Sequence, residues 1–276
     1  MGDPVNWRDS TPLGRSVDYD RGYDANLLVP IPRSEGREAL GLHGPLPFTG
    51  WDVWNAWEVS WLGAGGKPTM VRGEFRVPAD SPRIIESKSL KVYLNSLNQE
   101  RAGTLEEVQS LLARDLSDAS GAPVVVRLLP PDAWPTITTA PRGQCLDGLP
   151  IEVRHYHPEP SLLRLAGERE VVEALHTLLL RTCCPITGQP DWGGLEIRYR
   201  GPAIDHAGLL AYVISFRQQQ DFHEQCVERM FRDILAHCRP HELTLEAHYL
   251  RRGGVDINPF RTNTGETPEN SRWHLQ

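Results

Sequence analysis

Cys183, Cys184 and Asp191 are the residues in the sequence best suited to covalent chemistry. The prolines and the glycine that separate the thiols from the carboxylate predict a loop. Such a loop can fold back so that the carboxylate takes and returns a thiol proton. Because the thiolate is the reactive form of cysteine, the pattern predicts a nucleophile with an acid–base partner. The alternative is two small buried residues followed by a turn aspartate.

His223 and Glu224 form a second candidate pair, within the segment Asp221–Cys226. The segment opens a predicted helix, which we expect Asp221 to cap, and early acidic residues suit the helix dipole. The same residues would also suit an ordinary solvated first turn. The sequence contains no HExxH motif, so a metalloprotease is excluded.

Two further segments could bind phosphate. Glu86–Lys91 opens another predicted helix and contains two of the three lysines, and both helix amides and ammonium groups suit an anion. In Arg251–Gly254, two glycines let the backbone curl and two arginines could meet a phosphate. The alternatives are an amphipathic first turn and a plain hairpin turn.

Several established motifs are missing from the sequence. It contains no GxGxxG, Walker A or CxxC motif, and its histidines are scattered, so neither a Rossmann nucleotide site nor a metal site is supported. The start, Met1–Pro4, lacks the features of a signal peptide. The five irregularly spaced cysteines are therefore expected to be reduced thiols in the cytoplasm.

Composition limits the class of protein. A chain of 276 residues is one large domain or two ordinary ones, and 39% hydrophobic residues can form a packed core. The net charge of −7 argues against a nucleic-acid or anionic-membrane partner. The sequence has no apolar run of about 18 residues, so we expect no transmembrane helix.

The expected elements form two similar series. Hydrophobic periodicity predicts strands, then two helices, then strands in each half. In the first half we expect strands at 52–62, 69–77 and 122–128 and helices at 86–98 and 104–117. In the second half we expect strands at 168–182, 195–199, 243–250 and 255–259 and helices at 205–217 and 221–237. At 168–182 the residue propensities favour a helix, whereas the repeat favours a strand, and we predict a strand.

The two halves are interpreted as a duplication. Tyr93 aligns with Tyr212 and Val108 with Val227, and the apolar positions around them coincide. A stretch rich in proline, threonine and glycine at 129–150 separates the halves. We therefore predict an N-terminal module, 1–147, whose first 50 residues form an irregular arm, and a C-terminal module, 148–276, which carries the candidate cysteine.

Taken together, these segments resemble the two-module 7-cyano-7-deazaguanine reductases, the nitrile reductases of queuosine biosynthesis. The resemblance spans most of residues 45–265, with several motifs in the same order. The segments that carry it are Gly50–Asp52, Trp57–Leu62, Glu86–Lys91, Cys184–Trp192, Phe222–Arg229 and Arg251–Pro259. Cys183 departs from the family pattern, where asparagine is expected.

The resemblance implies an α+β fold of tandem tunnelling-fold modules, each a four-stranded antiparallel sheet with two helices. It also implies a cytoplasmic homodimer without a metal, a membrane contact or direct nucleic-acid binding. The implied reaction is NADPH-dependent reduction of the nitrile of 7-cyano-7-deazaguanine to 7-aminomethyl-7-deazaguanine through a cysteine thioimide, on the route to queuosine in tRNA.

The resemblance also implies roles for particular residues. Cys184 and Asp191 match the catalytic nucleophile and acid–base group. The positions matching the deazapurine-binding residues are Ile85, Glu86, Ser87, His223 and Glu224. The positions matching the NADPH-binding residues are Ser87, Lys88, Arg252 and Gly253.

Two alternatives stay open at this point. A pterin- or purine-processing enzyme similar to GTP cyclohydrolase could use the same fold, with a zinc site that the sequence does not supply. A purine-binding protein of this fold without catalytic activity is the other. A metal assay and a test of Cys184 reactivity would separate them.

Overall fold

The computed structural model describes residues 22–133 and 138–276 and contains two compact units. Unit 1 consists of Met1–Gly41, Val53–Thr136 and Arg251–Asp256, and unit 2 of Leu42–Asp52, Ile137–Leu250 and Ile257–Gln276. The features expected at Met1–Pro4 lie outside the described residues. The bounds of the two modules, 1–147 and 148–276, stay a prediction.

The elements follow one another in the expected order. Up to the proline-rich boundary they are η1 (Ala25–Leu27), β1 (Pro30–Pro32), α2 (Arg33–Ala39), β2 (Thr49–Leu62), β3 (Pro68–Pro78), β4 (Arg83–Ile85), α3 (Ser87–Ser96), α4 (Leu105–Ser120) and β5 (Val125–Leu129). Beyond it they are η2 (Pro131–Ala133), β6 (Thr138–Thr139), β7 (Gln144–Cys145), η3 (Pro160–Leu162), β8 (Leu165–Cys183), β9 (Pro190–Ile204), α5 (His206–Ser215), η4 (Phe216–Gln218), α6 (His223–Cys238), β10 (Glu242–Tyr249), β11 (Val255–Thr262) and β12 (Arg272–Trp273).

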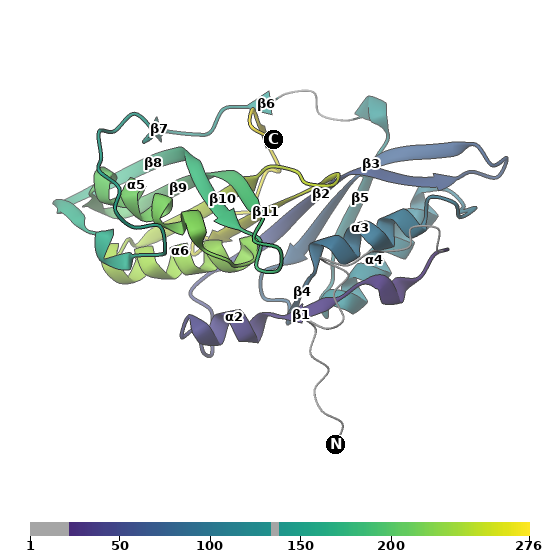
Figure 1. The fold of residues 1–276 in the computed structure, drawn as a ribbon, viewed down its shortest axis with the longest axis horizontal. Helices are drawn as coiled ribbons and strands as arrows, with labels where there is room; N and C mark the ends of the chain where they lie inside the picture. The colour runs from purple at the N-terminus through teal and green to yellow at the C-terminus, as the bar shows by residue number, and fades with distance from the viewer. Residues whose placement is uncertain (1–21, 134–137) are drawn as a thin grey trace, which may run out of the picture. The chain divides into compact units, whose positions relative to one another are not determined.

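Unit 2 contains the expected tunnelling-fold arrangement. Its sheet has the order β11-β10-β9-β8-β7, in which β8 to β11 pair antiparallel and the short β7 joins in parallel. Helices α5 and α6 connect β9 to β10 and cover one face of this sheet (Figure 1). The face of α6 that packs on the sheet carries buried residues at spacings of three and four, which is why this segment is helical.

Unit 1 has a smaller sheet of order β5-β3-β2, with α3 and α4 between β3 and β5. Thr104 and Glu107 form a capping box at the start of α4, and Gly121, at φ 77°, ends the helix in the left-handed conformation. In the described part of this unit no fourth strand follows β5. Pro130 and Pro131 come next and cannot donate to a strand ladder. The α+β class with tandem modules is confirmed, while the first module departs from the expected four strands.

The expected strands and all four expected helices are present, including β8, where helical propensity competes. The prediction of an irregular arm over residues 1–50 was wrong for part of this range, because β1 pairs with β4 and α2 follows directly after β1. The buried Arg33 holds this helix by donating to the Ser81 hydroxyl at 3.1 Å. These contacts are long-range, so local periodicity did not reveal them.

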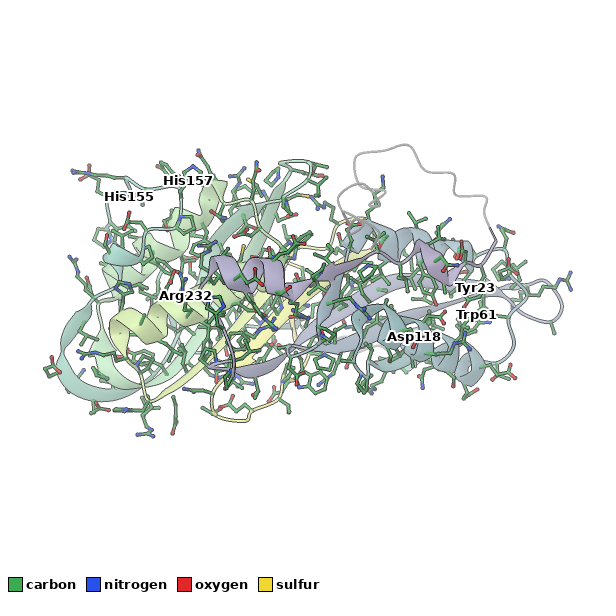
Figure 2. The ribbon with its side chains drawn as sticks, turned by 90° about the horizontal axis from the view of Figure 1, so that it is seen from below. Tyr23, Trp61, Asp118, His155, His157 and Arg232 are labelled. Atoms are coloured by element: carbon green, nitrogen blue, oxygen red, sulfur yellow. The ribbon has the colours of Figure 1, made fainter. Side chains whose placement is uncertain are left out.

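One polar interaction occurs at equivalent places in both units and supports the duplication. Tyr93 on α3 donates to Asp115 on α4 at 2.7 Å, and Tyr212 on α5 donates to Asp233 on α6 at 2.6 Å. In each case an arginine precedes the aspartate and donates to it. The one in unit 2, Arg232, is labelled on α6 in Figure 2. The helix pairs therefore share a buried polar contact as well as an apolar pattern.

We expect Tyr212→Phe to lower the free energy of unfolding by about 1–3 kcal/mol, because a buried carboxylate loses a hydrogen-bond donor. Burial and Asp233 raise the pKa of Tyr212 well above its usual value, so the phenol remains a donor at neutral pH. Urea denaturation would measure the change. Tyr93→Phe should give a loss of similar size, and the exposed Tyr156→Phe should give none. Equal stability of all three variants would contradict the prediction.

Among the described residues, no helix is both long enough and apolar enough to cross a membrane.

Candidate active site

The loop that carries Cys184 is fixed by its own backbone. It joins β8 to β9. The Cys184 amide donates to the Gln189 carbonyl at 2.8 Å, and the Gly188 amide donates to the Cys184 carbonyl at 3.0 Å. Gly188 has φ 68°, which favours glycine at this position. Cys184 is thus the first residue of a closed loop and is buried.

The two adjacent thiols lie in different surroundings. Cys183 ends β8, its amide donates to the Gln219 carbonyl at 2.8 Å, and its thiol lies 3.7 Å from the Arg217 carbonyl. Thr182, two residues before Cys184, pairs with Asp191 on β9, so the side chains of Thr182 and Asp191 share a face of the hairpin. Cys184 follows directly after the end of β8.

Two of the remaining cysteines are poor nucleophiles. Burial raises the pKa of Cys226 well above its usual value and that of Cys238 to about 11. Both thiols stay protonated at neutral pH and serve as small core residues. Cys145 is exposed on β7.

Asp191, His223 and Tyr249 form the next layer of the site. His223 Nε2 lies 3.4 Å from Asp191 Oδ2, and its ring stacks on Tyr249 with centroids 3.6 Å apart. Tyr249 ends β10 and is completely buried. Gly193, across the ladder from Tyr249, leaves room for it, because a Cβ there would come within 2.8 Å of the His248 carbonyl. Tyr249 is not among the site residues predicted from the sequence, and its position just before the Arg251–Gly254 motif was the available signal.

Glu224 lies in the first turn of α6 and is buried. The positive end of the helix dipole favours a carboxylate at this position. The expectation that Asp221 caps this helix was wrong, because α6 begins two residues later, at His223. Asp221 instead accepts from Gln219 at 2.7 Å and from Arg229 at 3.3 Å. These two hydrogen bonds connect the segment just before α6 to Arg229 on the helix.

One buried polar atom on this face has no hydrogen-bond partner in the part of the chain that the structure describes, His223 Nδ1. The Tyr249 and Thr182 hydroxyls lie close enough to bond to each other. Leaving a buried polar atom unpaired costs free energy, so buried polar groups in proteins are normally satisfied. A polar ligand bound here would supply a partner for His223 Nδ1.

The candidate binding residues Ile85, Glu86, Ser87 and Lys88 lie at the start of α3, in unit 1. Glu86 Oε1 accepts from the Lys88 amide and Oε2 from the Ser89 amide, each at 2.8 Å. The carboxylate is completely buried, and both oxygens cap the helix. Glu86 therefore fixes the position of the backbone that carries Ser87 and Lys88.

The turn that contains Arg252 and Gly253 is also in unit 1 and is held by Trp57. The Trp57 amide donates to the Gly254 carbonyl at 2.8 Å, and its indole donates to Asp256 at 2.7 Å. The Arg251 guanidinium lies 5.3 Å from the Trp57 ring centroid. Gly253 and Gly254 have φ of 60° and 76°. The left-handed region favours glycine at both positions.

The structure brings the predicted site residues together in two groups. Cys184, Asp191, His223 and Glu224 belong to unit 2, while residues 85–88 and the Arg252–Gly253 turn belong to unit 1. His155 and His157, labelled in Figure 2, lie in an exposed irregular segment. Over residues 22–133 and 138–276, no group of three or more His, Cys, Asp and Glu side chains is placed to hold a metal ion.

The fold defines the class of protein: an α+β protein of tandem tunnelling-fold modules, in which Cys184, Asp191 and His223 are candidate site residues. Residues 19–128 match the family model "Nitrile reductase, 7-cyano-7-deazaguanine-reductase N-term", and residues 190–268 match "QueF-like protein".

Curated relatives agree with these matches. A protein of Bordetella avium named NADPH-dependent 7-cyano-7-deazaguanine reductase is 52% identical, covering 92% of this chain and 93% of its own. A protein of the same name from Burkholderia vietnamiensis is 51% identical over 96% of this chain and 97% of its own. The chain belongs to the family of 7-cyano-7-deazaguanine reductases.

Proposed function

We propose that this protein reduces the nitrile of 7-cyano-7-deazaguanine to the primary amine, using NADPH. The observation that carries the proposal is the closed β8–β9 loop, which carries one buried thiol two residues after the ladder partner of Asp191, with His223 Nε2 3.4 Å from the Asp191 carboxylate. The family supplies the substrate and the cofactor, and the site supplies the chemistry.

The Cys184 thiol is the proposed nucleophile. A nitrile carbon is a weak electrophile, and addition of the thiolate converts it to a thioimide, which accepts hydride more readily. Asp191 takes the thiol proton and delivers it to the nitrile nitrogen. Bound NADPH supplies the hydride. Breaking the carbon–sulfur bond then releases an imine and regenerates the thiolate, and a second hydride and proton give the amine.

His223 and Glu224 in unit 2 are proposed to bind the base, and the resemblance implies the same role for Ile85, Glu86 and Ser87 in unit 1. The ring N–H and the exocyclic amine of a guanine-like base are adjacent donors, which suit a carboxylate such as Glu224. His223 has one ring nitrogen toward Asp191 and the other without a partner among the described residues, so it can bind the ligand through Nδ1. Because the Glu86 carboxylate caps α3, we propose that Ile85, Glu86 and Ser87 contribute mainly through their fixed backbone.

Ser87, Lys88, Arg252 and Gly253 are the proposed NADPH-binding residues. The left-handed glycine turn provides a concave backbone. A Cβ on Gly253 would lie 3.3 Å from the Lys91 side chain, and one on Gly254 would lie 3.0 Å from that of Glu58. The glycines therefore allow the Lys91 and Glu58 side chains to pack against the turn, and the neighbouring cations suit the phosphates of the cofactor.

NADPH oxidation with 7-cyano-7-deazaguanine tests the proposed function. We expect two NADPH to be consumed for each nitrile, because nitrile-to-amine reduction takes two hydrides. Absorbance at the nicotinamide band and mass analysis of the product would give the ratio. Binding of the purine without oxidation would favour the binding protein without catalytic activity, and a metal requirement with loss of a carbon from the purine would favour a cyclohydrolase-like enzyme.

We further propose that the enzyme works in the cytoplasm as a homodimer. All five cysteines are free thiols, which fits a reducing compartment. The dimer is an expectation from the resemblance, and sedimentation equilibrium of the purified protein would test it. A monomer at assay concentrations that turned over at the full rate would contradict it.

A further inference from the structure

On the side that faces β11, the end of β10 is held by side chains. The β10–β11 ladder runs from Thr244 to Glu246 on β10 and stops short of Tyr249. The Tyr249 amide donates to Asn258 Oδ1 at 3.1 Å, and the Tyr249 carbonyl accepts from Gln276 Nε2 at 3.1 Å. Gln276 Nε2 also donates to Asn258 Oδ1 at 2.9 Å. Two linked carboxamides therefore hold both backbone polar groups of Tyr249.

The Gln276 carboxamide makes the four hydrogen bonds that such a group can make. Nε2 donates two of them. Oε1 accepts from the Trp273 amide at 3.1 Å and lies 3.1 Å from His248 Nδ1, which is the donor because Oε1 can only accept. These partners fix the orientation of the amide, since Nε2 faces two acceptors and Oε1 faces a backbone N–H. The side chain has no spare donor or acceptor for a ligand, so its role is to hold other residues in place.

The segment 272–276, which contains Gln276, packs on the sheet of unit 2. β12 pairs with β6, and the chain's end lies beside β6 in Figure 1. The buried Trp273 ring stacks on His248 with centroids 4.1 Å apart, and a Cβ on Gly194 of β9 would come within 2.7 Å of that indole. Arg272 donates to the main-chain oxygen of Gln276 at 2.6 Å. The indole and this hydrogen bond keep Gln276 next to the end of β10.

These contacts reach the candidate active site through one residue of β10. Neighbouring side chains of a strand point to opposite faces, so His248 and Tyr249 lie on opposite sides of the sheet. Segment 272–276 therefore packs on one face, and His223 stacks on Tyr249 on the other, with centroids 3.6 Å apart. His223 Nε2 in turn lies 3.4 Å from Asp191 Oδ2. All of these residues belong to unit 2.

We infer that Gln276 is a positioning residue for the candidate active site. Its amide fixes the backbone of Tyr249, and the Tyr249 ring fixes the plane of the His223 ring. A stacked ring can slide on its partner, so the place of His223 Nδ1 depends on how firmly Tyr249 is held. The effect on binding of the base rests on the proposed function, whereas the positioning of His223 is a property of the protein without a ligand.

Histidine NMR of the full chain without a ligand tests the positioning. Gln276→Met keeps the length of the side chain and removes its four hydrogen bonds. We expect the His223 ring resonances of this variant to move toward those of an exposed histidine, because the ring current of Tyr249 acts only over a short distance. The resonances are assigned by their absence from the spectrum of His223→Gln.

Equilibrium binding of 7-cyano-7-deazaguanine tests the consequence for the site. The titration uses Cys184→Ala as the parent protein, so that no covalent adduct forms. Adding Gln276→Met should raise the Kd for the nitrile roughly 5- to 10-fold, the effect of one weakened hydrogen bond from His223. The Kd for NADPH should not change, because its proposed binding residues belong to unit 1.

His274→Ala is the control for a general loosening of the segment. His274 is exposed and lies 3.2 Å from the Thr138 hydroxyl, so this variant loses a contact of the segment and leaves the Gln276 amide intact. Its His223 resonances and its Kd for the nitrile should match those of the parent. The thermal unfolding midpoint of each variant shows whether the fold is retained. Gln276→Glu, which keeps the shape and the acceptor and loses the two donors, should reproduce the changes of Gln276→Met.

Two results would overturn the inference. One is an unchanged Kd or unchanged His223 resonances in the Gln276 variants, and the other is an equal change in His274→Ala. If the His223 resonances moved as expected but the parent protein failed to bind the nitrile, the positioning of His223 would stand and the proposed function would fail.

Discussion

Cys184→Ala is expected to lose turnover by at least about 10⁴-fold, because it removes the group that makes the nitrile carbon reactive toward hydride. NADPH oxidation with the nitrile measures the rate. Mass spectrometry of the native protein mixed with the nitrile alone should show a covalent adduct, which the variant should lack. Because Cys184 is small and on a loop, the variant should fold.

Cys183→Ala is the control for this prediction. Its thiol is next to the Arg217 carbonyl, so the variant should keep most of the activity and still form the adduct. If Cys183→Ala lost the adduct and Cys184→Ala kept it, Cys183 and not Cys184 would be the nucleophile. If both variants kept the native rate, the thioimide step would be refuted.

Arg261→Met is expected to lower the free energy of unfolding by about 3–5 kcal/mol, the cost of breaking a buried ion pair by removing one partner. Arg261 is completely buried and donates to Asp52 at 2.8 Å and to Glu228 at 2.9 Å. These two carboxylates raise the pKa of Arg261 above its usual value, so it stays charged. Methionine fills a similar space but leaves both carboxylates buried without their cation.

Urea denaturation would measure this loss, with Arg200→Met as the control. Arg200 pairs with Glu242 on the exposed surface, where ion pairs contribute little, so this variant should be as stable as the native protein. A change at Arg261 no larger than that at Arg200 would contradict the prediction.

The helices and the long hairpins could be predicted from the sequence, because their apolar spacing agrees with their burial. The strand at 168–182 could be predicted only by comparison with the other half of the repeat, since local propensity favoured a helix there. β1 and α2 could not be predicted, because long-range contacts such as that of Arg33 with Ser81 hold them. β9 begins five residues before the expected start at Leu195. Gly193 and Gly194 have poor strand propensity but make room for Tyr249 and Trp273.

The candidate site was predictable where residue type and motif order coincided, as for Cys184, Asp191, His223 and Glu224. The parts of the site geometry that depend on burial could not be predicted from the sequence. The sequence allowed capping residues in the first turn of α3 without assigning the cap to the Glu86 carboxylate, and no pattern indicated that Tyr249 stacks on His223. A charged residue in a strand, such as Arg261, is normally expected at the surface, and its two acidic partners lie far from it in the sequence.

The distribution of lysine has a practical consequence for chemical labelling. Lys67, Lys88 and Lys91 are the three lysines of the chain, and all belong to unit 1. An amine-selective acylating reagent therefore has no lysine target in unit 2, and its reaction with side chains is confined to α3 and the β2–β3 turn. Peptide mapping after acylation thus gives a footprint of unit 1 alone, and cross-links between lysines report only distances within that unit.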